Sequence, residues 1–151
     1  MSTLFASLLV LHIMSGLTGT ILTYATLLIV LKKEVVRKKF FITSSLAWLS
    51  YVVTWFSGGY YYWFYYGAQV KPIIKAGQYP WAHSIVMEAK EHIFLLLPVL
   101  SLVIALIAWS STDSINADSR LKSAVVYLIA VTCTIAVLVA LSGIIISGGA
   151  Q

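Results

Sequence analysis

Charged residues are scarce in this chain: Asp, Glu, Lys and Arg make up 10% of its 151 residues, while 60% are hydrophobic and the mean hydropathy is +0.93. A soluble domain carries about 25% charged residues, so this deficit excludes an ordinary soluble protein. The few charges also gather in short blocks between long apolar runs. This composition is typical of an integral membrane protein that consists of a single domain, 1–151.

Cysteine and the common motifs of soluble enzymes are lacking as well. Cys133 is the single cysteine, which excludes an internal disulfide, a CxxC redox motif and a cysteine-rich metal site. Its apolar neighbours favour a packing or lipid-facing residue. The sequence holds no P-loop, no dinucleotide-binding fingerprint and no nucleophile elbow. These absences leave an enzymatic activity open and favour an electron-transfer or accessory role over that of a stand-alone enzyme.

Four long apolar segments are present, and each can cross a bilayer as a helix. They cover about residues 4–31, 40–60, 92–110 and 123–146. About 20 helical residues span the hydrocarbon core, and a helix satisfies its own backbone polar groups there. Short connections after the first and third segments predict antiparallel neighbours. The expected fold class is therefore all-α: an integral membrane four-helix up-and-down bundle.

Lysine and arginine are distributed unequally between the two sides of the predicted bundle. Seven of the ten lie in the two short connections, against three on the other side. The seven are Lys32, Lys33, Arg37, Lys38, Lys39, Arg120 and Lys122. Positive charge beside a span marks the cytoplasmic side and contact with anionic lipid far more often than a nucleic-acid site. We therefore expect contact with the lipid bilayer, no nucleic acid, a prokaryotic cytoplasmic membrane, and both termini outside.

The segment 61–91 is expected to form an outer loop. It continues a run of seven aromatic residues, 60–66, which we interpret as a belt at the membrane interface. A partner contact surface and a lid over a bound cofactor are the alternatives. Pro80 suits the first turn of a helix, so a helical start is predicted near residue 81.

Two histidines fall at one depth of the predicted bundle. His12 lies nineteen residues before Leu31, and His92 lies eighteen before Ser110. At about 1.5 Å per residue, both imidazoles are about 27 to 29 Å from the inner boundary. An ionisable side chain inside a span is costly and usually functional. The pair is therefore interpreted as the two axial ligands of a b-type haem.

Glycines surround this histidine layer. Gly16 and Gly19 share the helical face of His12, and the same depth count on the other helices reaches Gly59 and Gly143. A glycine inside a helix costs about 1 kcal/mol relative to alanine, so such a cluster indicates the close approach of another group. We interpret it as clearance for a flat porphyrin, with plain helix packing as the alternative.

The stretch MEAKEH, residues 87–92, surrounds the second histidine with charge. The carboxylate of Glu88 is one turn before His92 and can accept the second ring N–H of its imidazole. Lys90 can pair with a haem propionate, and a solvated helix start is the alternative interpretation of the stretch. His83 would point to the opposite face of a continuous helix from His92. We expect it to be an interfacial or partner residue, or a ligand of a second site.

Two segments carry a resemblance to known families. The stretches LHIMSGLTGTILTYATLLIVL and AKEHIFLLLPVL resemble segments of copper-resistance D-type membrane proteins and of the small membrane protoporphyrinogen oxidases. Both families place a histidine on an early helix and a histidine or lysine on a later one. The resemblance implies haem ligation by His12 and His92, and we carry over no enzymatic activity from it.

Three functions fit these patterns. The first is a membrane cytochrome b, or a haem-bearing subunit of a membrane redox complex, that exchanges electrons near the outer face with a quinol or a redox protein. The second is a non-catalytic accessory subunit of a larger membrane complex, in which glycines and aromatic residues serve helix packing. The third is a copper or non-haem iron site, whose ligands would be His12, His92, Glu88 and His83. The sequence also allows an oligomer.

Overall fold

The computed structural model describes residues 2–150, in which every regular element is a helix. The elements are α1 (Thr3–Val30), α2 (Arg37–Tyr61), η1 (Tyr62–Val70), α3 (Lys71–Ala76), η2 (Ala82–Met87), α4 (Glu88–Phe94), α5 (Leu96–Ser110), α6 (Thr112–Ala117) and α7 (Ser119–Gly148). They form four rods that are long and apolar enough to cross a membrane: Thr3–Val30, Arg37–Ala76, Ala82–Ser110 and Ser119–Gly148. The all-α class and the membrane-length helices are thus confirmed for the described residues.

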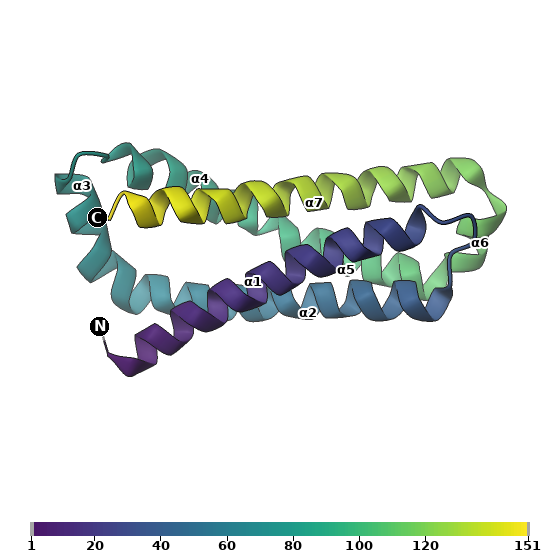
Figure 1. Cartoon of the computed structure of the whole chain (residues 1–151), viewed down its shortest axis with the longest axis horizontal. Helices are drawn as coiled ribbons and strands as arrows, with labels where there is room; N and C mark the ends of the chain where they lie inside the picture. Colours follow the sequence, from purple (N-terminus) through teal and green to yellow (C-terminus); the bar gives the residue numbers. More distant parts are fainter. Residues whose placement is uncertain (1, 151) are drawn as a thin grey trace.

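The rods form a bundle in which each rod packs against two neighbours. α1 and α5 both pack on α2 and on α7, so that successive rods are adjacent and alternate in direction (Figure 1). Both termini and α3 lie at one end, here named the terminal end, whereas the loop 31–36 and α6 lie at the other, here named the basic end (Figure 1). This is the expected up-and-down topology, and it puts the two termini on the same side of the bundle.

The basic end is filled with apolar side chains and closed by hydrogen bonds. Its core consists of Val30, Val35, Phe40, Ile104, Ala108, Ile115, Val125 and Ile129. The side chain of Asn116 accepts a hydrogen bond from the backbone N–H of Val35 at 2.9 Å and donates one to its carbonyl at 3.0 Å. Asp118 caps α7 by accepting from the N–H of Arg120 at 2.8 Å. The loops at this end are therefore fixed to the core.

The terminal end differs from the expected outer loop, because most of the segment 61–91 is helical. α2 does not end near residue 60, since η1 and α3 continue the rod to Ala76. The next rod starts at Ala82, close to the start predicted near residue 81. Both η1 and η2 are π-helical, a form with wider turns that is frequent at functional sites. The aromatic run 60–66 thus lies on a helix, and its role as a membrane belt stays a prediction.

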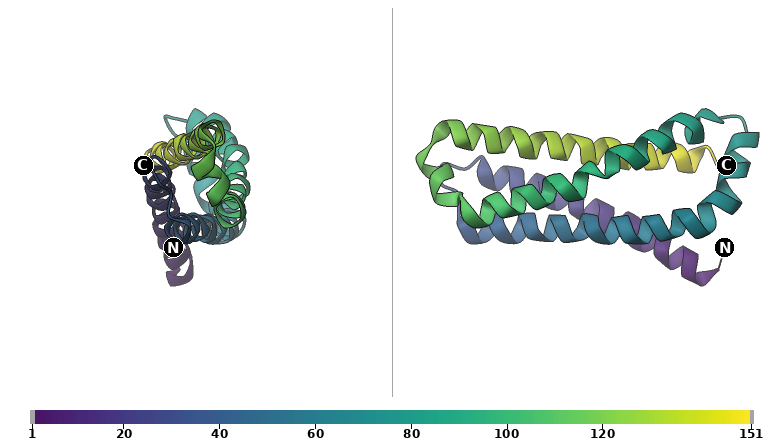
Figure 2. Two further views of the ribbon diagram at one scale, coloured as in Figure 1. Left: turned by 90° about the vertical axis from the view of Figure 1, so that its right-hand side faces the viewer. Right: turned by 180° about the vertical axis from the view of Figure 1, so that it is seen from behind.

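A break divides the third rod into α4 and α5. Proline has no N–H, so Pro98 cannot form the bond that an α-helix would make to the carbonyl of Phe94, and the helix is interrupted at Leu95. Beyond this break α4 packs on α7, and the rod crosses α7 toward the terminal end (Figure 2). The break therefore decides which side chains of α4 enter the bundle.

α1 is the least covered rod. It crosses α2 obliquely, and its N-terminal end projects from the bundle (Figures 1 and 2). In its most apolar window 6% of the residues are buried, against 28% to 33% in the other three rods. Large apolar side chains such as Val10, Met14 and Ile21 are more than half exposed. Such a surface is suited to contact with the lipid bilayer.

Candidate functional site

His12 lies on α1 and is half-buried against α2. Its Nδ1 is 2.9 Å from the backbone oxygen of Thr54. A carbonyl only accepts hydrogen bonds, so Nδ1 carries the proton and the lone pair of the imidazole is on Nε2. Gly58 makes this contact possible, because a Cβ there would stand 2.3 Å from Nδ1. A neutral imidazole held in this way, with Nδ1–H donated to an oxygen, is typical of metal-binding histidines.

Gly16 and Gly19, expected to leave room for a flat ligand, are covered by α2. A Cβ at Gly16 would lie 3.5 Å from the methyl group of Thr54, and one at Gly19 would lie 2.8 Å from the ring of Tyr51. The hydroxyls of Thr23 and Tyr51, 2.9 Å apart, strengthen the same contact. The strip therefore contributes to the close packing of α1 on α2, as in the alternative interpretation of these glycines.

Lys90 of α4 is the second basic side chain that reaches the layer of His12. Its Nζ would be 3.5 Å from a Cβ at Gly143 of α7, and its charge lies within electrostatic range of the His12 imidazole. The two basic groups thus each pack on a glycine of another helix. Gly59, expected in this layer, has no described atom within 4 Å of its Cβ position, and its neighbour Gly58 contacts His12 instead.

His92 is exposed on α4, and its Nδ1 is 2.7 Å from the backbone oxygen of Glu88. The carboxylate of Glu88 was expected to orient this ring. The backbone carbonyl of Glu88 orients it instead. Two residues along an α-helix correspond to about 200° of rotation and about 3 Å of rise. His92 consequently matches the depth of Lys90 but points to the other side of α4. The structure does not bring the imidazoles of His12 and His92 together.

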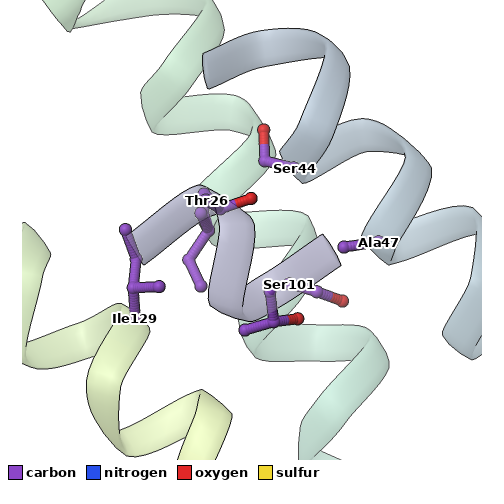
Figure 3. A pocket seen from close by; sticks show the side chains of 7 residues that line it. Thr26, Ser44, Ala47, Ser101 and Ile129 are labelled. Atoms are coloured by element: carbon purple, nitrogen blue, oxygen red, sulfur yellow. The ribbon is translucent and has the colours of Figure 1, made fainter. Parts of the chain in front are cut away.

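A small cavity lies between the His12 layer and the basic end. It measures about 10 Å³, room for about one water molecule, and side chains of all four rods line it (Figure 3). The lining residues are Thr23, Thr26, Ser44, Ala47, Ser101, Ile104 and Ile129. The hydroxyls donate to carbonyls of their own helices, as Thr26 does to Leu22 at 2.7 Å and Ser101 to Leu97 at 2.6 Å. This cavity is too small to hold an organic cofactor.

His83 is the most deeply buried histidine, with 1% of its surface exposed. Its Nδ1 is 3.0 Å from the hydroxyl of Tyr66, whose ring stacks on that of Tyr62 with centroids 5.2 Å apart. Within residues 2–150, the Nε2 atom of His83 and the Oε1 atom of Glu91 are buried without a hydrogen-bond partner. The histidine expected at an interface with a partner or the membrane is therefore part of the interior of the terminal end.

Charges of both signs surround this buried histidine. Glu88 and Glu91 lie within electrostatic range of the His83 imidazole, and so do Lys71 and Lys75. Their formal charges cancel. Glu91 also acts on the phenols of Tyr62 and Tyr66, so the carboxylate lies among the rings that join the two π-helical segments.

The four residues of the copper or iron alternative are spread over the bundle. His12 contacts α2, His92 lies on the outer surface of α4, and His83 contacts Tyr66 of η1. Across residues 2–150, no group of three or more His, Cys, Asp or Glu side chains is arranged to hold a metal ion. The structure therefore gives this alternative no common site with Glu88.

Several residues around His12 and His83 were not predicted as site residues from the sequence. Thr54 and Gly58 contact His12, and Tyr66 and Glu91 belong to the surroundings of His83. A backbone carbonyl acceptor such as that of Thr54 leaves no mark in residue type. The aromatic run 60–66 offers seven candidate rings, and only the packing of η1 on η2 selects the one that meets His83.

No protein-family model matches the chain, and no curated protein or solved structure is significantly similar to it. The resemblance of its two short segments to haem membrane proteins therefore stays an expectation. The function has to be inferred from the contacts of the side chains themselves.

Proposed function

We propose that the protein is a membrane b-type haem protein that transfers electrons, in which His12 would hold the haem iron. The observation that carries this proposal is the fixed imidazole of His12, whose Nδ1 donates to Thr54 at 2.9 Å. The glycine at position 58 is required for that placement. An iron ligand needs a neutral imidazole with its Nε2 lone pair available, and a hydrogen bond from Nδ1 to a carbonyl favours that tautomer.

Lys90 would be the second residue that holds the haem iron in this proposal, in place of His92. Lys90 lies in the layer of His12 and packs on Gly143, whereas His92 points away from it on the same helix. A lysine ligand binds iron as the neutral amine, because a ligand has to release its proton before it coordinates a metal. The families that the two segments resemble have a histidine or a lysine on the later helix, which agrees with this assignment.

The haem proposal is supported by the donor atoms of His12 and Lys90, and not by the glycines at positions 16 and 19. His12 and Lys90, which lie on different rods, would hold such a group, whereas Gly16 and Gly19 are packed against α2. A bound haem would supply one-electron transfer. His12 and Lys90 would therefore serve to hold and tune the group, and the partner would be a quinol or a redox protein at the terminal end.

The test is the absorption spectrum of the protein purified in detergent, oxidised and then reduced with dithionite. The unmodified protein is expected to show a Soret band that His12→Ala abolishes and Lys90→Ala abolishes or shifts. His92→Ala is the matched control, since its exposed imidazole lies on the same helix, and its spectrum should be unchanged. A protein without a Soret band, or a band that survives His12→Ala unchanged, rejects the haem. A band that depends on His92 and not on Lys90 keeps the haem and rejects the lysine ligand.

We also propose that the basic end faces the cytoplasm of a prokaryotic cell and that both termini are outside. Seven of the ten lysine and arginine residues belong to the short connections, and such residues are retained on the cytoplasmic side. Single cysteines in a Cys133→Ser background test this orientation. A membrane-impermeant maleimide is expected to label Gln78→Cys in intact cells, and Ser114→Cys only after permeabilisation. The reverse pattern contradicts the proposal.

A non-catalytic accessory subunit is the second candidate. Two observations favour it: Gly16 and Gly19 serve helix packing, and α1 is the least covered rod. A second membrane protein would then cover α1. This role predicts a stable complex on purification in mild detergent, and it predicts that His12→Ala leaves the complex intact. A protein that purifies alone and requires His12 for a haem spectrum excludes it.

A further inference from the structure

Two buried polar atoms at the terminal end have no partner in the part of the chain that the structure describes. They are the Nε2 of His83 and the Oε1 of Glu91, both on the rod that η2 and α4 form. A buried polar group without a hydrogen bond costs about 1–3 kcal/mol, and more when the group is charged. Proteins rarely keep such atoms without a bound water, an ion or a ligand. A bound water, ion or ligand is therefore the expected partner of these two atoms.

The His83 imidazole is oriented as a metal ligand is oriented. Its Nδ1 meets the hydroxyl of Tyr66 at 3.0 Å, and a phenolic oxygen can accept the ring N–H. Nε2 then carries a lone pair, and this atom is buried without a hydrogen-bond partner among the described residues. Histidines that bind metals almost always donate their other ring N–H to an oxygen in this way.

The carboxylate of Glu91 belongs to the same interface. It acts electrostatically on His83, Tyr62 and Tyr66, and an ionised carboxylate only accepts hydrogen bonds. Its unpartnered oxygen therefore calls for a donor or a cation. A cation is attracted by both this oxygen and the lone pair of His83, whereas another acceptor satisfies neither.

We propose that His83 and Glu91 bind a divalent first-row metal ion between η1 and the rod of η2 and α4. Imidazole nitrogen with carboxylate and phenol oxygen suits zinc, copper(II) or iron(II), and Tyr62 is the nearby phenol that can complete the ligand set with water. Both helical segments leave regular α-geometry at this contact, as π-turns at functional sites often do. The site shares no ligand with the haem proposed at His12 and stands independently of it.

The experiment measures metal binding by the full chain in detergent after treatment with a chelator. Calorimetric titration with Zn²⁺ is expected to give one equivalent for the unmodified protein and none for His83→Gln. Glu91→Gln keeps the shape of the side chain and removes its charge, so it should weaken binding strongly. Tyr66→Phe removes the group that orients the imidazole and should weaken binding by about 10- to 100-fold. His92→Gln, an exposed imidazole on the same rod, is the matched control and should bind as the unmodified protein does.

Copper(II) supplies a second readout, whose first result comes from the unmodified protein and needs no variant. With one equivalent of Cu²⁺, pulsed electron paramagnetic resonance of the unmodified protein should detect the remote nitrogen of one coordinated imidazole. His92→Gln should keep this signal, and His83→Gln should lose it. A titration without a Zn²⁺ equivalent, equal binding by His83→Gln, or no imidazole signal would each overturn the proposal. A buried water would then be the partner of the two atoms, and the Soret band would remain a separate test of the haem.

Discussion

The two ends of the bundle are built differently. At the basic end the helices are regular, the core is apolar from Val30 to Ile129, and Asn116 satisfies both backbone groups of Val35. At the terminal end two segments are π-helical, and two buried polar atoms lack partners within residues 2–150. Sequences break local rules mainly where function requires it. The contrast agrees with the proposals that place the chemistry at the terminal end, while the basic end stabilises the bundle.

The same contrast appears in the way small and polar residues are used. Near the basic end, buried hydroxyls such as Ser44 and Thr112 donate to carbonyls one turn earlier, at 2.7 Å in both cases. They add no unsatisfied group to the interior. Toward the terminal end, Gly58 and Gly143 adjoin His12 and Lys90, so small residues there accommodate ionisable ones. The predictions below test this division, beginning with the change expected to cost most.

Removing a core side chain at the basic end should have the largest effect on stability. Phe40 is fully buried, and Phe40→Ala is expected to lower the free energy of unfolding by about 3–5 kcal/mol through lost burial and the cavity left behind. Phe41→Ala is the matched control, because its ring is 40% exposed and should cost much less. Denaturation with a strong detergent from mixed micelles measures both. Equal costs for the two variants would remove the distinction between core and surface at this end.

A methyl group at Gly58 should have the next largest effect. The Cβ would stand 2.3 Å from the His12 ring, so Gly58→Ala forces the imidazole away from Thr54. Overpacking of this kind costs about 1–3 kcal/mol, and the proposed haem spectrum should be lost with it. Gly59→Ala is the adjacent control, since no described atom lies within 4 Å of its Cβ. A Gly58→Ala protein with unchanged stability and spectrum would contradict the role assigned to this contact.

Sequence physics predicted the fold because few solutions exist for such a chain. Apolar segments of membrane length have to be helices, and short basic connections make them antiparallel. The depth count put His12 and His92 in one layer, and Lys90, two residues before His92, lies within electrostatic range of His12. The depth count could not give the direction in which a side chain points around the helix axis. The break at Leu95 and the π-turn of η2 reset that direction, and they depend on packing.

The partners of the polar groups were unpredictable for a related reason. Thr54 binds His12 through its backbone oxygen, and any residue type could have offered that oxygen. The glycines at 16 and 19 look the same in the sequence whether a porphyrin or a tyrosine covers them. His83, in the segment 61–91, was expected at an interface because a continuous helix would point it to the face opposite to His92. Once this segment extends the rods, the same residue becomes interior.

Removing the hydroxyl of Tyr66 should have a smaller effect on stability and a specific one on the terminal end. Tyr66→Phe leaves a buried ring nitrogen of His83 without its partner at 3.0 Å, which should cost about 1–2 kcal/mol in metal-free protein. Tyr60→Phe, whose ring is 46% exposed, should be nearly neutral. Hydrogen exchange should show the loss of protection in η1 and η2 and not at the basic end. Uniform loss along all four rods would mean that the two ends unfold as one unit.

The smallest effect is expected for the ion pair on the surface of the basic end. Arg37 and Asp113 approach to 2.7 Å, but their side chains are 51% and 86% exposed. Water and salt screen such pairs, so a double-mutant cycle with Arg37→Gln and Asp113→Asn should give a coupling of about 0.2–1 kcal/mol. That coupling should vanish near 1 M salt, where the Debye length is about 3 Å. A larger coupling that resists salt would show that charge, and not the apolar core around Phe40, holds this end together.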